Sequence, residues 1–114
     1  MSASLSELNS DPYFKVIVSR LKAEFHPKKL FLFGSRAYGK AREDSDYDFV
    51  LVADKTERGR IENLIRASEI CRDIPISIDV FVYPETEFLA WKDEFNSLPE
   101  IASTTGIEVN LADF

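Results

Sequence analysis

Aspartates occupy every second position in the segment Asp44-Ser45-Asp46-Tyr47-Asp48. Because the side chains of a β-strand alternate between its two faces, carboxylates at this spacing point to one face, and the Cα atoms of Asp46 and Asp48 would lie roughly 6–7 Å apart. Carboxylates held together repel one another and lose hydration, and a divalent cation offsets both costs. Oxygen ligands without a neighbouring His or Cys favour Mg²⁺, or Mn²⁺, over Zn²⁺. The spacing therefore predicts a metal site at Asp46 and Asp48, whereas we interpret Asp44 as a loop or turn residue.

The alternative interpretation is an acidic loop with its side chains in water. The apolar run of residues 49–53 that follows predicts a strand buried on both faces, which would hold the aspartate pair at its mouth. A third carboxylate, Asp79, lies in the middle of residues 76–83, a predicted strand in which aspartate is disfavoured. Asp79 could belong to the outer face of an edge strand. Beside the aspartate pair, a third metal ligand or general base explains it better, because two-metal phosphoryl chemistry uses such a set.

A strand, a tight turn and a short helix are predicted ahead of the aspartates. The apolar run of residues 30–33 ends at Gly34, and the chain then becomes polar and helix-compatible from Ser35 to Tyr38. Free backbone N–H groups at such a turn, together with the Ser35 hydroxyl, could bind a phosphate. The alternative is a plain Gly-Ser turn without a ligand.

Three separated elements agree in residue type and order with a known family. Gly34-Ser35, then ten residues, then Asp46-Tyr47-Asp48, with Asp79 on a later predicted strand, resembles the signature of the DNA polymerase β-type nucleotidyltransferase superfamily. The sequence Gly34-Ser35-Arg36-Ala37-Tyr38-Gly39 resembles its minimal nucleotidyltransferase (MNT) branch. The resemblance covers about residues 30–83 and is thin outside that span.

The resemblance implies an α/β (α+β) fold, the polymerase β-type nucleotidyltransferase fold, in which helices flank a small mixed sheet. It implies that Gly34 and Ser35 bind the triphosphate of ATP and that Asp46 and Asp48 bind Mg²⁺. Asp79 would complete the second metal site and help to deprotonate the attacking hydroxyl, and whether it acts as a base or only as a metal ligand stays open. Such chemistry depends mainly on positioning and on charge neutralisation by the metals.

Arg36 follows the turn directly and is predicted to contact a phosphate, the alternative being a solvated helix residue. The spacing of Gly34, Gly39 and Lys40 mimics a P-loop, but the next residue is Ala41, which has no hydroxyl for Mg²⁺. A P-loop also needs a larger parallel sheet than this chain allows, so that class is rejected.

The partner is predicted from the resemblance alone. MNT proteins are typically antitoxins paired with a HEPN-type RNase toxin, which they silence by transferring AMP to a tyrosine. Two alternatives remain, namely a protein that masks its partner without chemistry, and transfer to a small molecule such as an aminoglycoside. The acceptor's identity, the base preference, the number of AMP units added, the stoichiometry with a partner and the role of the C-terminal segment are not encoded in any motif.

Length and composition indicate one domain. The chain has 114 residues, of which 45% are hydrophobic, so we expect a single domain over residues 11–114 after a flexible Ser-rich tail of residues 1–10. The net charge of −6 argues against a protein that tracks nucleic acid. No signal peptide or long apolar span is evident, and one cysteine, Cys71, fits a reducing cytoplasm, so we expect a soluble cytoplasmic protein without a membrane partner.

Three further helices are expected around the strands. The first begins at Asp11-Pro12 with an apolar stripe and ends before Pro27, where His26 caps carbonyls. The second, capped by Thr56, covers about residues 57–71. Its core-facing stripe is predicted to contain Ile61, Leu64, Ile65, Ser68 and Cys71.

The third helix is expected at about residues 87–96, with Trp91 interpreted as a core residue rather than a nucleotide stack. The segment of residues 97–114 contains an apolar run with β character at residues 107–111. It could add an edge strand or dock on a partner.

Overall fold

The computed structural model describes Leu8, Arg42 and residues 11–39 and 45–114. The predicted flexible tail, residues 1–10, lies outside these residues apart from Leu8, which packs in the hydrophobic core. Asp44, interpreted above as a loop or turn residue, also lies outside them.

A four-stranded mixed sheet forms the centre of the described chain, with strand order β3-β2-β1-β4. Strand β1 is antiparallel to β2 and to the edge strand β4, whereas β2 and β3 are parallel. The small mixed sheet flanked by helices is therefore confirmed, and the C-terminal segment does supply an edge strand. The bounds are β1 Lys29–Phe33, β2 Tyr47–Ala53, β3 Ile78–Pro84 and β4 Ile107–Glu108.

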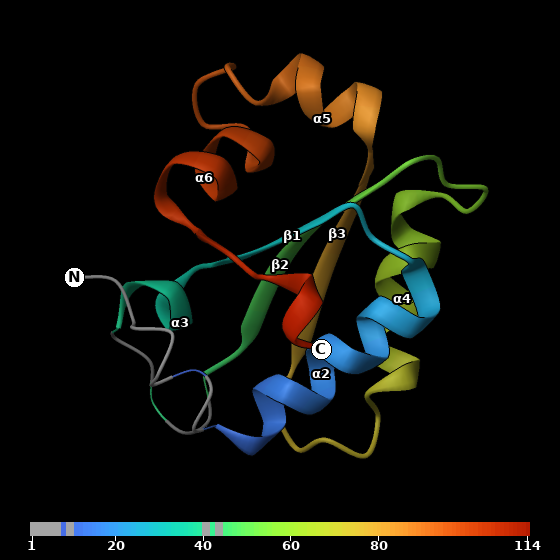
Figure 1. Ribbon diagram of the computed structural model, residues 1–114, viewed down its shortest axis with the longest axis vertical. Helices are drawn as coiled ribbons and strands as arrows, with labels where there is room; N and C mark the ends of the chain where they lie inside the picture. Colours follow the sequence, from blue (N-terminus) through green and yellow to red (C-terminus); the bar gives the residue numbers. More distant parts are fainter. Residues whose placement is uncertain (1–7, 9–10, 40–41, 43–44) are drawn as a thin grey trace.

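The helices form a layer on each face of the sheet (Figure 1). Helices α2 and α4 pack against one face, and α5 and α6 pack against the other, with a separate hydrophobic cluster on each side. None of the helices in the described chain has the length and hydropathy needed to cross a bilayer. The bounds are α2 Pro12–Phe25, α3 Ser35–Tyr38, α4 Arg60–Ile70, α5 Glu85–Trp91 and α6 Leu98–Thr105, followed by a short 3₁₀ helix, Leu111–Asp113.

Helix α2 confirms the prediction for the first helix. The carboxylate of Asp11 accepts the backbone N–H of Tyr13 at 2.9 Å, and Pro12 occupies the first turn. At the other end His26 is the C-cap in a left-handed conformation, and its backbone N–H donates to the carbonyl of Lys22. The core-facing side chains are Phe14, Ile17, Val18 and Leu21.

Helix α4 corrects the second prediction. It begins at Arg60 after the N-cap Gly59, and Thr56 is not the cap. Instead the Thr56 hydroxyl donates to Arg58 O and accepts the side-chain amide of Asn63 at 3.0 Å. The predicted core stripe is largely wrong, since Ile61 is 72% exposed, Ile65 is 53% exposed and Ser68 is exposed. Of the other two residues of that stripe, Leu64 is half-buried and Cys71 is buried.

The side of α4 that faces the sheet carries Asn63, Ala67 and then Cys71. The buried amide of Asn63 is satisfied because it also donates to the carbonyl of Arg58 at 3.3 Å. The small side chain of Ala67 lets the helix approach the sheet closely. A paired polar residue and an alanine therefore face the core, while two isoleucines face outward.

The third predicted helix is shorter than expected. Helix α5 ends at Trp91, whose side chain is 50% exposed, so the interpretation of Trp91 as a core residue is wrong. Phe88 is buried instead and stacks on Phe31 with ring centroids 5.5 Å apart. Helix α6 was not predicted, although Ser97 caps it by accepting the backbone N–H of Glu100.

Candidate active site

The Gly34-Ser35 turn joins β1 to α3, as predicted. Gly34 has φ +79° and ψ −163°, a backbone conformation that is essentially restricted to glycine. Its carbonyl accepts the backbone N–H groups of Ala37 at 3.0 Å and Tyr38 at 3.2 Å, which closes the single turn of α3. Phosphate binding at Gly34 and Ser35 stays a prediction.

Asp48 lies directly against this turn. A Cβ atom added to Gly34 would be 2.5 Å from Oδ2 of Asp48 and 3.4 Å from its Cγ. Only glycine therefore leaves room for the carboxylate beside the turn. This contact brings the two halves of the predicted site together, although they are separated in the sequence by more than ten residues.

Asp79 is the direct neighbour of Asp48 on the adjacent parallel strand. Both side chains are partly exposed, and Asp46, one residue before β2, is exposed. Burial raises the pKa of the Asp48 carboxyl, and the negative charges of Asp79 and Asp46 raise it further. Cross-strand neighbours share a face of the sheet, so the side chains of Asp48 and Asp79 lie on the same face. The charge of Asp46 also acts on Asp48, because it contributes to the raised pKa of that carboxyl.

These residues fit a divalent cation. Among the residues that the structure describes, no group of three or more His, Cys, Asp or Glu side chains already has the arrangement needed to hold a metal ion. Mg²⁺ rarely uses such a cage, because it is usually bound through one or two carboxylates, the phosphates of the substrate and water. Burial and the repulsion of the neighbouring carboxylates, which together raise the pKa of Asp48, are costs that a cation would offset.

An aromatic pair lies beside the carboxylates. Phe33 is the cross-strand partner of Asp48, and Phe81 follows Asp79 by two residues, so all four side chains share one face of the sheet. The two rings are partly exposed, with centroids 6.2 Å apart and planes inclined by 47°. The carboxylates therefore lie beside a partly exposed apolar surface formed by Phe33 and Phe81, which we call the aromatic floor.

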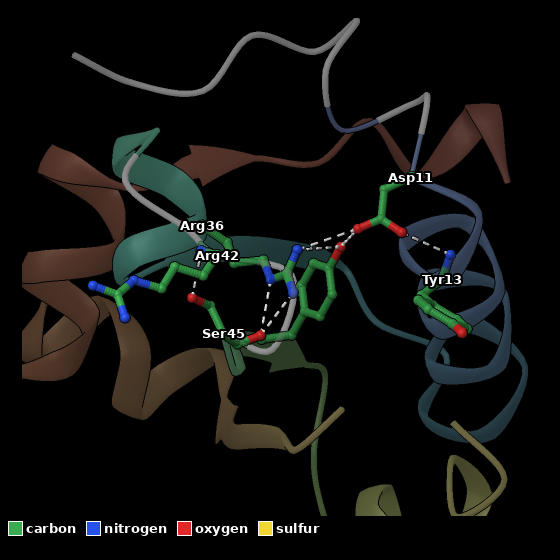
Figure 2. Close-up of polar contacts among 6 residues, drawn as sticks. Asp11, Tyr13, Arg36, Arg42 and Ser45 are labelled. Carbon is green, nitrogen blue, oxygen red and sulfur yellow. Dashed lines mark hydrogen bonds and ion pairs between the residues drawn. The ribbon is translucent and has the colours of Figure 1, made fainter. Parts of the chain in front are cut away.

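Arg36 is not a solvated helix residue, because its side chain is only 10% exposed. Its guanidinium donates to the backbone carbonyl of Ser45 and to the carboxylate of Asp11, as Figure 2 shows. Its predicted contact with a phosphate stays a prediction. Sequence reasoning treated Asp11 only as a helix cap and gave Ser45 and Tyr47 no role, and no local spacing signal connects them.

Cys71 is buried, at 3% exposure, as expected for a packing residue. Burial raises the pKa of its thiol, which disfavours the reactive thiolate.

The chain matches a known protein family. The family described as "Polymerase beta, Nucleotidyltransferase" matches residues 15–80, which is more than half of the 114 residues. The matched span includes the Gly34-Ser35 turn and all three carboxylates, Asp46, Asp48 and Asp79. No curated protein matches the chain. The chain belongs to the polymerase β-type nucleotidyltransferase family.

Proposed function

We propose that this nucleotidyltransferase uses Mg²⁺ to transfer AMP from ATP to a tyrosine hydroxyl of a partner protein. The observation that carries the proposal is the placement of Asp48, which lies against Gly34 on one side and beside Asp79 on the other. A turn suited to phosphate and a pair of carboxylates suited to a cation thus meet at one point of the sheet.

The order of the strands supports a direction for the proposed reaction. Strands β1, β2 and β3 are consecutive in the sheet, so the turn, Asp48 and Asp79 follow one another across it. In nucleotidyl transfer the acceptor oxygen bonds to the α-phosphorus while the bond to pyrophosphate breaks, with the two oxygens roughly in line. Pyrophosphate would leave over the turn, and the acceptor would approach from the side of β3.

The three carboxylates and the Gly34-Ser35 turn would each have a task in this arrangement. Bound Mg²⁺ would neutralise charge on the phosphates and lower the pKa of the attacking hydroxyl. Asp46 and Asp48 would hold the cation, and Gly34 and Ser35 would hold the leaving phosphates. Asp79 would complete the second metal site on the side of β3 and help to take the proton of the attacking hydroxyl. Asp79→Asn should abolish transfer and leave nucleotide binding largely intact.

The aromatic floor supports an aromatic acceptor. Phe81 lies next to Asp79 on the same face of β3, and its ring contacts that of Phe33. A phenol ring approaching Asp79 could pack on these rings, and aromatic pairs contribute about 0.5–1.5 kcal/mol beyond the area they bury.

Exposed apolar side chains support a protein as the partner. Large exposed apolar groups that gather on a surface are common at protein interfaces. The resemblance to the MNT branch suggests which kind of protein the partner is, namely a HEPN-type RNase toxin. Transfer of AMP would silence that toxin, and this protein would then be its antitoxin. On α5 and the loop that follows it, the exposed large apolar residues are Leu89, Trp91 and Phe95, and on α4, which packs against the other face of the sheet, they are Ile61 and Ile65.

The test is transfer of label from ATP into proteins of a lysate from the source cell, with Mg²⁺ present. We would compare the α-labelled and γ-labelled nucleotides and three proteins, namely the wild type, the Asp46→Asn, Asp48→Asn double variant, and Asp54→Asn. Asp54 is a matched control because it is an exposed aspartate just beyond the opposite end of β2.

The proposal predicts one protein labelled from the α-position only, by the wild type and Asp54→Asn but not by the double variant. Mass spectrometry of that protein should place AMP on tyrosine. A partner that the double variant still retains and silences, without any label, would indicate a masking protein. Label on an added aminoglycoside would indicate a small-molecule transferase.

A further inference from the structure

Arg36 connects the Gly-Ser turn to the strand that carries the carboxylates. From the first turn of α3 its Nε and Nη2 atoms donate to the backbone carbonyl of Ser45 at 3.0 and 2.8 Å. Ser45 directly precedes Asp46, and its own hydroxyl accepts the backbone N–H of Arg42 at 2.8 Å (Figure 2). The backbone that leads into the metal-binding strand is therefore held by the residue that follows the turn.

Tyr47 is the second point of attachment. It lies between Asp46 and Asp48 in the sequence, and its fully buried ring points to the opposite face of β2, where it packs on Phe14 and Phe49. The guanidinium carbon of Arg36 is 4.2 Å from the centroid of this ring. Burial and the hydrogen bond to Asp11 raise the pKa of the phenol, so it stays protonated and donates to that carboxylate.

Asp11 completes the connection from α2. One carboxylate oxygen caps the helix by accepting the N–H of Tyr13, and the other accepts Tyr47 and Nη1 of Arg36, the latter at 3.3 Å. The first turn of α2, the first turn of α3 and the start of β2 thus meet at one carboxylate, as Figure 2 shows for Asp11, Tyr13 and Arg36.

We propose that Arg36, Tyr47 and Asp11 form a positioning network that fixes the Asp46–Asp48 segment relative to the Gly34-Ser35 turn. The proposal rests on the function proposed above. Asp46 precedes the strand, and the hydrogen bonds from Arg36 to the carbonyl of Ser45 restrain the backbone directly before it. The three residues act through the carboxylates and the turn.

The test compares Arg36→Lys and Tyr47→Phe with Arg20→Lys. Arginine binds in a planar fork that lysine cannot reproduce, and phenylalanine keeps the ring but loses the hydroxyl donor. Arg20 is a matched control because it also binds one carboxylate, Asp73, and one backbone carbonyl, that of Ile70 at 3.0 Å, outside the site.

Two measurements separate positioning from stability. The first is amide hydrogen exchange of the metal-free protein at residues 45–49, which includes the N–H of Tyr47 bonded to Ser77 O at 3.0 Å. The second is binding of the Mn²⁺ complex of a non-hydrolysable ATP analogue, followed by water-proton relaxation.

The network predicts exchange in residues 45–49 that is at least about fivefold faster in Arg36→Lys and Tyr47→Phe but unchanged in Arg20→Lys. It also predicts Mn²⁺–nucleotide affinity that is about 10–100-fold weaker in the same two variants, as is typical for residues that orient metal ligands. Unchanged exchange in these variants would overturn the proposal. Weaker affinity in Arg36→Lys alone would also overturn it, in favour of a direct phosphate contact. A wild type that binds no Mn²⁺–nucleotide would contradict the proposed function, and the exchange experiment would still decide on the network.

Discussion

Replacing Gly34 by alanine should damage the site and the fold together. At φ +79° and ψ −163° an alanine adopts a backbone conformation that costs about 1–3 kcal/mol. Its Cβ would also be 2.5 Å from Oδ2 of Asp48, which forces that side chain out of its preferred rotamer at a cost of about 0.5–1.5 kcal/mol. We therefore expect the free energy of unfolding of Gly34→Ala to fall by about 1.5–4.5 kcal/mol.

The same substitution should reduce transfer more than its loss of stability explains. Displacing a catalytic group by about 1 Å can cost about 100-fold in rate, and the added methyl group would clash with the Asp48 carboxylate and push it aside. Urea unfolding followed by circular dichroism gives the free energy of unfolding, and transfer from α-labelled ATP is measured at a temperature where both proteins are folded.

Gly59→Ala is the matched control. Gly59 has φ −67° and ψ 168°, which any residue adopts, and the nearest atom to an added Cβ is 3.6 Å away. Alanine lowers the entropy of the unfolded chain but is a poorer helix cap than glycine, and these effects offset each other. We expect a change within about 0.5 kcal/mol and normal transfer. A Gly34→Ala protein that unfolds at the wild-type urea concentration and transfers label at the wild-type rate would refute this account of the turn.

Three further predictions test other parts of the structure. Since burial and the neighbouring carboxylates raise the pKa of Asp48, ionisation of Asp48 destabilises the fold as the pH rises past the ordinary value for aspartate. In the absence of divalent cations, Asp48→Asn should therefore raise the free energy of unfolding, measured by urea titration at pH 7, by up to about 2 kcal/mol. The same titration at lower pH should show a smaller gain, and a loss of stability at pH 7 would contradict this prediction. Ile17→Ala should cost about 2–5 kcal/mol in urea unfolding because Ile17 is fully buried, whereas the same change at Ile61, which is 72% exposed, should cost less than about 0.5 kcal/mol; equal costs would mean that the outward face of α4 is assigned wrongly. Cys71 should react with a thiol reagent at pH 8 much more slowly in the folded protein than in urea, because it is buried and its thiol has a raised pKa; equal rates would argue against its burial.

The features that sequence predicts correctly are those set by local spacing. The Gly34-Ser35 turn follows from a glycine at the end of an apolar run, and the placement of Asp48 and Asp79 follows from their positions in two predicted strands. Register also matters, because the parallel pairing of β2 with β3 places Asp79 directly beside Asp48, and this pairing and its register were not predicted from the sequence.

The features that sequence missed depend on partners far apart in the chain. Two sets of residues on α4 have the helical spacing expected of a core-facing side, one with Ile61 and Ile65 and the other with Asn63 and Ala67. Hydrophobicity alone selects the set with the isoleucines. The other set is buried because the loop before the helix satisfies the amide of Asn63. In the same way Ser45 and Asp11, to which Arg36 donates, are 9 and 25 residues away from it, so its role cannot be recognised from its neighbours in the sequence.

The central claim is that Asp46 and Asp48 bind the cation that accompanies the nucleotide. The most direct test measures water-proton relaxation of the Mn²⁺ complex of a non-hydrolysable ATP analogue as protein is added. The account predicts that the wild type and Asp54→Asn enhance relaxation and that the affinity of the Asp46→Asn, Asp48→Asn double variant is more than about tenfold weaker. A folded double variant that binds the Mn²⁺–nucleotide complex as tightly as the wild type would contradict the account.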